Sequence, residues 1–375
     1  MIQSARVPRF PGTDANAGIA NGLSARLDMN HLHLLLPGDL AATTGGTLYD
    51  RHVVDGLREL GWHIQVCCLD TSFPTPSAQA LTEAARLLAG INDHARVLID
   101  GLALGAMPEV LAAQAYRLRL IALVHHPLAL ETGLDPHLAQ ALRQSETAAL
   151  RHVRHVIVTS PYTASLLNDF GVAATRIDVI EPGCKPAALA TGSGPGPLHI
   201  LCVGSLTPRK GHHLLIDALA RLTRLDWMLI CAGSLERAPD TASALCERIH
   251  ALGLQSRVHL LGEVPASELA ALYKQADLFV LPSLFEGYGM VYAEALAHGL
   301  PVLGTSAGAI PDTVPADAGL LVEPGSASAL ATALERLLSD RPLRDRLAAG
   351  ARRARTRLPT WQDRARRFAE VLNHV

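Results

Sequence analysis

The chain has 375 residues, of which 49% are hydrophobic, and its formal net charge at pH 7 is −2. This length exceeds one ordinary core and predicts two domains, while the near-neutral charge provides no general field for nucleic acid. No stretch approaches the ~20 apolar residues of a membrane span, and the first 25 residues lack the apolar segment of a secretion signal. We therefore expect a soluble, cytoplasmic protein.

The six cysteines are Cys67, Cys68, Cys184, Cys202, Cys231 and Cys246. No two of them have C-x2-C spacing, and most lie in apolar, strand-like runs. We interpret them as buried free thiols in a reducing compartment.

Residues 1–27 are rich in Pro, Gly, Ser, Asn and Ala and are predicted to form a disordered extension. The run HLHLLLPG at 31–38 then predicts a first strand, and residues 46–61 place their apolar side chains on one helical face. Further strand-like and helical segments alternate up to residue 183. This alternation predicts a parallel sheet with helices on both faces in a Rossmann-like domain over residues 28–183.

Residues 184–197 lack periodicity and are dominated by Gly, Pro, Ala and Ser, which is typical of a linker. The same alternation restarts at residue 198 and predicts a second Rossmann-like domain over residues 198–358, with a cleft facing the first. The final helices are predicted at about 327–338 and 342–375.

Two glutamates, Glu286 and Glu294, frame a glycine-containing turn after the strand-like run DLFVLPS. Ligands of open α/β sheets bind at the carboxyl ends of strands, and Gly287 and Gly289 allow a sharp turn and close backbone approach. A helix predicted from about Met290 would direct its first N–H groups toward an anion. This arrangement suits a ligand with both sugar hydroxyls and phosphates.

The pattern E-G-Y-G-x-x-x-x-E, followed by A-x-x-x-G-x-P-V, resembles the signature of the family 4 retaining glycosyltransferases, which have the GT-B fold of two facing Rossmann-like domains. The resemblance extends over nearly the whole chain from about His31. It implies that Glu286 and the backbone of Gly289, Met290 and Val291 hold the donor sugar and its diphosphate, and that Glu294 holds the nucleotide ribose.

The loop that follows the second domain's first strand supplies two cations, Arg209 and Lys210. Arginine can bind two phosphate oxygens and lysine acts as a movable charge, so both suit a leaving diphosphate. The family usually has G-R-L-x-x-x-K-G here. Lys210 matches the lysine, but Ser205, itself a donor-binding candidate, stands where the arginine is expected, and Arg209 is the candidate substitute.

In the first domain, Gly45 and Gly46 precede a predicted helix, and the resemblance assigns them to a glycine-rich loop over the donor. The family's fourth strand ends in a histidine followed by an acid. His125 matches that histidine and is a catalytic candidate, whereas His126 replaces the acid; Glu131 is a candidate on the acceptor side. The other histidines, His212 among them, show no zinc-binding spacing, so no zinc site is predicted.

Two further loops of the second domain resemble those that line the nucleotide base in the family. They contribute Gly233, Glu263 and Val264 as donor-binding candidates. The segment PTWQDRARRF resembles the family's closing helix, which predicts that residues 359–375 cross back to the first domain.

These features predict a retaining transferase that moves a hexose from a UDP- or GDP-sugar to the hydroxyl of an unidentified glycan, lipid-linked or small-molecule acceptor. No D-x-D metal motif occurs, so no metal and no cofactor are expected. The alternatives are a GT-B epimerase or phosphorylase, a glycoside hydrolase that uses Glu286 and Glu294 as its carboxylate pair, and a membrane-surface nucleotide-binding module without catalysis.

The membrane alternative rests on ten arginines between Arg341 and Arg367, against only Asp345 and Asp363. Such a basic stretch could bring the protein to anionic lipid at the inner face of the cell membrane. A solvated arginine-rich helical face is the other interpretation of the same residues.

Overall fold

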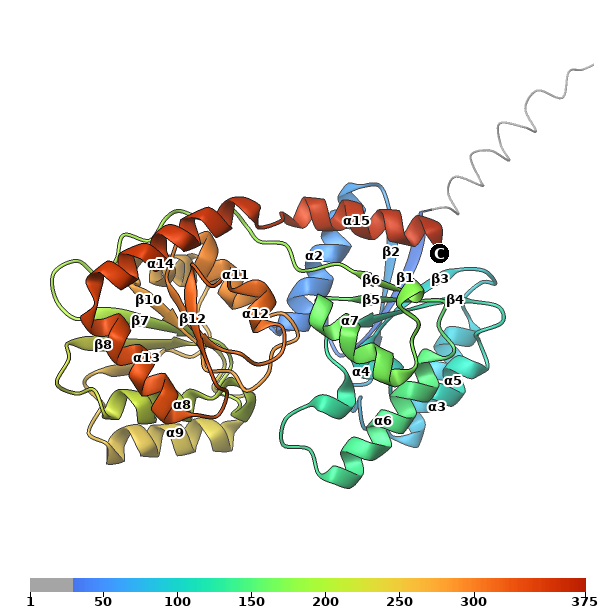
Figure 1. Ribbon diagram of the computed structural model, residues 1–375. Helices are drawn as coiled ribbons and strands as arrows, with labels where there is room; N and C mark the ends of the chain where they lie inside the picture. The colour runs from blue at the N-terminus through green and yellow to red at the C-terminus, as the bar shows by residue number, and fades with distance from the viewer. Residues whose placement is uncertain (1–29) are drawn as a thin grey trace, which may run out of the picture.

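The computed structural model describes residues 30–375, and the predicted extension over residues 1–27 lies outside that range. Two parallel six-stranded sheets form the centres of two lobes (Figure 1). The first sheet has the order β2-β1-β3-β4-β5-β6, and the second has the order β12-β11-β10-β7-β8-β9. The predicted fold class, two doubly wound α/β domains, is confirmed.

The strands of the first lobe are β1 (His31–Pro37), β2 (His63–Leu69), β3 (Arg96–Asp100), β4 (Arg119–Val124), β5 (His155–Val158) and β6 (Ile177–Val179). Those of the second lobe are β7 (Leu198–Val203), β8 (Trp227–Ala232), β9 (Val258–Leu260), β10 (Leu278–Val280), β11 (Val302–Thr305) and β12 (Gly319–Val322). No helix or strand interrupts residues 180–197, which join the two sheets.

The helices of the first lobe are α2 (Gly45–Glu59), α3 (Ala78–Ala89), α4 (Gly101–Leu104), α5 (Pro108–Ala112), α6 (Pro136–Leu150) and α7 (Pro161–Leu167). Those that follow are α8 (His212–Ala220), α9 (Pro239–Ala251), α10 (Ala266–Gln275), α11 (Met290–Ala297), α12 (Ile310–Thr313), α13 (Ala327–Ser339), α14 (Arg341–Ala354) and α15 (Trp361–His374). Among the described residues, none of these helices has the length and apolar character needed to cross a membrane.

The strands are apolar because helices cover both faces of each sheet. In β4, residues 120–124 are all fully buried. The first lobe has one apolar cluster on each side of its sheet, and the second lobe has one large cluster that takes in most of its helices.

Helix α15 belongs to the last part of the chain but lies on the first lobe, where it runs against α2 (Figure 1). Its buried residues Phe368, Val371 and Leu372 join the core of that lobe. The two helices approach so closely that a Cβ on Gly56 would lie 2.5 Å from the Cβ of Ala365. A larger residue at position 56 would therefore push α15 away.

The prediction of one helix over residues 342–375 is wrong, because α14 ends at Ala354 and α15 begins only at Trp361. A 3₁₀ turn at Arg355–Arg357 and Pro359 separate them. The Thr360 side chain then caps α15 in a capping box with Asp363, a strong helix-start signal. This break lets the chain pass from the second lobe to the first.

We predict that Phe368→Ala destabilises the first lobe by about 3–5 kcal/mol, the usual cost of emptying a fully buried aromatic site. Urea unfolding followed by circular dichroism measures this loss. The matched control is Gln362→Ala on the exposed side of α15, which should change stability by less than about 0.5 kcal/mol. A loss below about 1 kcal/mol for Phe368→Ala would contradict the docking of α15.

Candidate active site

The two lobes touch at the carboxyl ends of their sheets. A Cβ on Gly287 would lie 2.2 Å from the backbone oxygen of His125, so the loop after β10 fits against the end of β4 only with glycine there. Beside this contact, a Cβ on Gly45 would lie 3.7 Å from the Met290 side chain, which brings the starts of α2 and α11 together. The predicted donor loops of both lobes therefore meet at one place.

The centre of this region is the buried carboxylate of Glu286, which is only 5% exposed. Lys210 Nζ lies 2.7 Å from one carboxylate oxygen, and Arg209 Nη1 lies 3.3 Å from the other. The Ser283 hydroxyl also donates to Glu286 at 2.6 Å. Burial alone would raise the pKa of Glu286, but Lys210 and then Arg209 outweigh it, so this pKa lies below its ordinary value.

Arg209 also reaches across to the first lobe. Its Nε lies 3.3 Å from a carboxylate oxygen of Glu131, which follows the 3₁₀ turn Leu128–Leu130. The Glu131 side chain is 45% exposed, so this contact lies near solvent. Arg209 thus joins the acceptor-side candidate Glu131 to the donor-side candidate Glu286.

The helix α11 begins at Met290, as the sequence predicts, and Gly289 precedes it with a left-handed φ of 86°. Glu294 lies one turn into α11, where the Tyr273 hydroxyl donates to it at 3.0 Å. Burial raises the pKa of Glu294, although Tyr273 opposes that shift. The same Tyr273 hydroxyl lies 3.4 Å from the backbone oxygen of Val291.

The remaining donor-binding candidates lie in loops at the same edge of the second sheet. Gly233 follows β8 with a φ of 150°, and a Cβ there would lie 2.2 Å from the backbone oxygen of Gly204, next to Ser205. Glu263 accepts a hydrogen bond from the Thr43 hydroxyl of the first lobe at 3.1 Å, with Val264 beside it. The Gly233 N–H also donates to the backbone oxygen of Gly262 at 2.8 Å, so the loops after β7, β8 and β9 are neighbours.

His125 lies after β4 with its Nε2 between two carboxylates that the sequence analysis missed. Asp50 Oδ1 is 3.1 Å away and Asp100 Oδ2 is 3.5 Å away. Burial alone would lower the pKa of His125, but the two carboxylates raise it to about 10. The ring therefore carries a positive charge at neutral pH, and a Cβ on Gly46 would lie 3.4 Å from it.

One sequence signal could have found Asp100, because it is the polar residue that ends the apolar strand β3. Asp50 gave no such signal, because its position on α2 resembles that of any helical aspartate. His126, which replaces the family's acid, is half-buried and lies against Phe285, with ring centroids 4.4 Å apart. Burial lowers its pKa to about 4, so this histidine is neutral.

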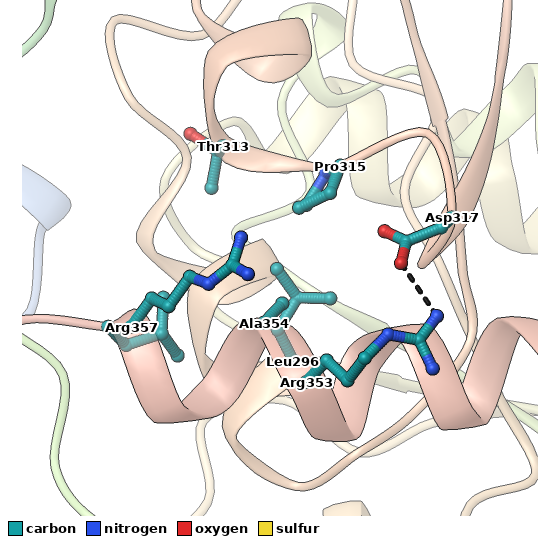
Figure 2. Close-up of a pocket in the computed structure, with 8 residues that line it drawn as sticks. Leu296, Thr313, Pro315, Asp317, Arg353, Ala354 and Arg357 are labelled. Carbon is teal, nitrogen blue, oxygen red and sulfur yellow. Dashed lines mark hydrogen bonds and ion pairs between the residues drawn. The ribbon is translucent and has the colours of Figure 1, made fainter.

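A separate cavity of about 160 Å³ lies at the other end of α11, against α14 (Figure 2). Arg357 points toward it, while the Arg353 guanidinium lies 2.7 Å from Asp317. Pockets for drug-sized ligands measure about 300–1,000 Å³. This cavity is therefore too small for a nucleotide sugar.

Seven of the ten arginines between Arg341 and Arg367 have contacts within the protein. These are Arg341, Arg344, Arg353, Arg355, Arg364, Arg366 and Arg367, which pair with carboxylates or donate to backbone oxygens. Fewer charges are therefore left for lipid than the sequence count suggests, and membrane contact stays a prediction.

Comparison with known proteins agrees with the fold. The protein-family model "Glycosyltransferase Family 4" matches residues 44–187, and "Glycosyl transferases group 1" matches residues 190–354. The MMP alpha-(1->4)-mannosyltransferase of Mycolicibacterium hassiacum is 30% identical over 316 residues, which cover 80% of this chain and 75% of that protein. The D-inositol 3-phosphate glycosyltransferase of Corynebacterium glutamicum is 33% identical, but the match covers only 54% of its length.

Solved structures show the same fold at lower identity. Sucrose-phosphate synthase from Thermosynechococcus elongatus superposes with a TM-score of 0.79 at 22% identity, over 92% of this chain and 98% of that one. Anabaena Alr3699/HepE, solved in complex with UDP and glucose, gives 0.74 at 22% identity, over 92% of this chain and 99% of that one.

These observations define a two-domain glycosyltransferase of GT-B fold. The chain belongs to the group 1 glycosyl transferases, with an N-terminal domain of glycosyltransferase family 4. The family resemblance and the glycosyltransferase activity predicted from the sequence are confirmed at this level.

We predict that His125 titrates near pH 10 and that Asp50→Asn lowers its pKa by at least one unit. The His125 pKa is raised on folding, so its ionic contribution to stability is complete below the unfolded value of about 6.5 and is lost as pH rises through about 10. NMR of the histidine Cε1–H signals measures both values, with Asp55→Asn, another aspartate of α2, as the control. A His125 pKa below 7 in the wild type would contradict the charged state.

Proposed function

We propose that this chain is a retaining glycosyltransferase that moves a hexose from a UDP- or GDP-sugar to an acceptor hydroxyl. The observation that supports this best is the buried Glu286 carboxylate, which two cations hold beside the start of α11. A donor needs three things here: a carboxylate for sugar hydroxyls, cations for the diphosphate, and backbone amides at a helix start. All three lie at the meeting of the two lobes.

The leaving diphosphate would take up negative charge as the glycosidic bond breaks. We infer that Lys210, Arg209 and the first amide groups of α11 stabilise this charge, because each is directed to the same edge of the second sheet. Before the donor binds, both cations are neutralised by Glu286 and Glu131. The diphosphate would replace these carboxylates as the partner of at least Arg209.

The acceptor hydroxyl would attack from the face that the diphosphate leaves, and its proton would pass to a phosphate oxygen of the departing group. The sugar then keeps its anomeric configuration. The close contact between Gly287 and His125 would help to exclude water from the reacting sugar. His125 has Nε2 committed to Asp50 and Asp100, which leaves Nδ1 to donate to a sugar hydroxyl.

Glu294 would bind the two ribose hydroxyls of the nucleotide, with Tyr273 holding its carboxylate in place. The loops of Gly233 and Glu263 would flank the base. A hexose donor agrees with the names of the mannosyltransferase relative and of the UDP-glucose complex of Anabaena Alr3699/HepE. The acceptor would enter from the first lobe, on the side of Glu131.

We predict that Lys210→Ala lowers kcat for hexose transfer by about 10²–10³-fold, the usual cost of one preorganised charge-stabilising group. Release of UDP or GDP from the matching donor measures this change. Lys274→Ala is the matched control, because Lys274 is another of the three lysines in the chain and lies exposed on α10. Circular dichroism checks that both variants fold.

A Lys210→Ala enzyme with kcat within three-fold of the wild type would contradict the assigned diphosphate site. Loss of activity in the Lys274→Ala control as well would also contradict it, since the effect would then not belong to this site.

We also propose that transfer requires no metal ion, because cationic side chains and helix amides provide the positive charge around the diphosphate. Turnover is expected to stay within two-fold of its starting value after dialysis against EDTA, as measured by nucleotide release. A strict requirement for added Mg²⁺ or Mn²⁺ would contradict this part of the mechanism.

A further inference from the structure

Beneath the donor loops, three side chains that are not used in the proposed reaction come together in the core. Cys202 of β7 and Cys231 of β8 are direct partners in the register of the parallel sheet. His212, the first residue of α8, completes the group. Their exposed fractions are 0%, 1% and 3%, so all three are fully buried.

The geometry of the group is that of a ligand set. Both sulfur atoms and a ring nitrogen lie within 4.8 Å of one another, close enough to share one ion. Both ring nitrogens of His212 are buried without a hydrogen-bond partner. Buried polar groups are nearly always paired, so an unpaired imidazole beside two thiols requires an explanation that apolar packing does not supply.

The ligand types select the kind of ion. Thiolates are soft ligands that favour Cu(I) and zinc, and imidazole suits both. Zinc is almost always four-coordinate in structural sites. Among residues 30–375, no fourth Cys, His, Asp or Glu joins this group, which favours an ion that accepts three ligands.

We propose that Cys202, Cys231 and His212 form a buried, three-coordinate site for a soft monovalent metal ion, Cu(I). Binding needs no redox step: the two thiols release their protons to solvent as the ion is bound. This site is separate from the proposed transfer reaction, and its occupancy does not depend on whether the donor assignment is correct.

The position of the site suggests what the ion would stabilise. Cys202 lies two residues before Gly204, Cys231 lies two residues before Gly233, and His212 lies two residues after Lys210. Cys202 and Cys231 lie near the ends of β7 and β8, and the loops after these strands carry donor-binding candidates. His212 starts α8, directly after the loop that carries Arg209 and Lys210. One bound ion would thus fix three segments beneath the donor site.

The test uses a host protein without its accessible thiols. Cys67, Cys68 and Cys246 are the cysteines that are not fully buried, and adjacent surface thiols could bind copper adventitiously. The host therefore carries Cys67→Ser, Cys68→Ser and Cys246→Ser. Cu(I), supplied without oxygen as its acetonitrile complex, is titrated against a chromophoric chelator to give stoichiometry and affinity.

The host is expected to bind one Cu(I) per chain. Cys202→Ala, Cys231→Ala and His212→Leu in this host should each weaken binding at least 100-fold. The matched controls are Cys184→Ala, which removes a buried thiol outside the group, and His213→Leu, which removes the neighbouring histidine. Both controls should bind as the host does.

X-ray absorption of the Cu(I)-loaded host gives a readout that needs no core variant to fold. Two sulfur ligands and one nitrogen ligand are expected. Fewer than 0.2 Cu(I) per chain, equal binding by host and Cys202→Ala, or sulfur-only coordination would overturn the proposed site. Tighter binding of Zn²⁺ than of Cu(I) would overturn the three-coordinate assignment.

Discussion

The rest of the site depends on the ion pair between Glu286 and its two cations. A buried carboxylate is costly unless it is paired and hydrogen-bonded, and Glu286 has Lys210, Arg209 and Ser283 as partners. These contacts connect the loop after β10 with the loop after β7. The two strands are neighbours in the second sheet. The same contacts place the carboxylate and the cations where a sugar and its diphosphate would lie. One interaction therefore serves both the packing of these loops and the proposed chemistry.

The two lobes meet around this ion pair. Gly287 has no side chain, and only for that reason can its loop approach the end of β4. Arg209 bridges to Glu131, and Thr43 bonds Glu263 farther along the edge. Helix α15 returns to the first lobe and connects the lobes a second time. The charged His125 lies at the same contact, held by two aspartates of the first lobe.

Local patterns predicted most of the fold and the loops that carry the candidate site residues. The start of α11 at Met290 was predicted from the glycine-containing turn before it. The Glu286–Lys210 contact joins residues 76 positions apart, and only the family resemblance suggested that they share a site. The sequence did not predict the role of Asp50 on α2 or the group of Cys202, Cys231 and His212. Their positions depend on which helices pack over which strands, and the spacing of residues along the chain does not show that packing. The prediction of one helix over residues 342–375 overlooked the helix-start signal at Pro359 and Thr360, although residues 359–375 were separately predicted to cross back to the first domain.

Thermal unfolding of the wild type and of Lys210→Ala with UDP, GDP and ADP tests whether Glu286 and its two cations form a nucleotide-diphosphate site. A nucleotide at about 100 times its dissociation constant adds roughly 2.7 kcal/mol of stability, which should raise Tm by several degrees. We expect such a rise for the wild type with UDP or GDP, and a clearly smaller one for Lys210→Ala. If no nucleotide raises Tm in the wild type, or if both proteins respond equally, the proposed diphosphate site at Glu286 and its cations is wrong.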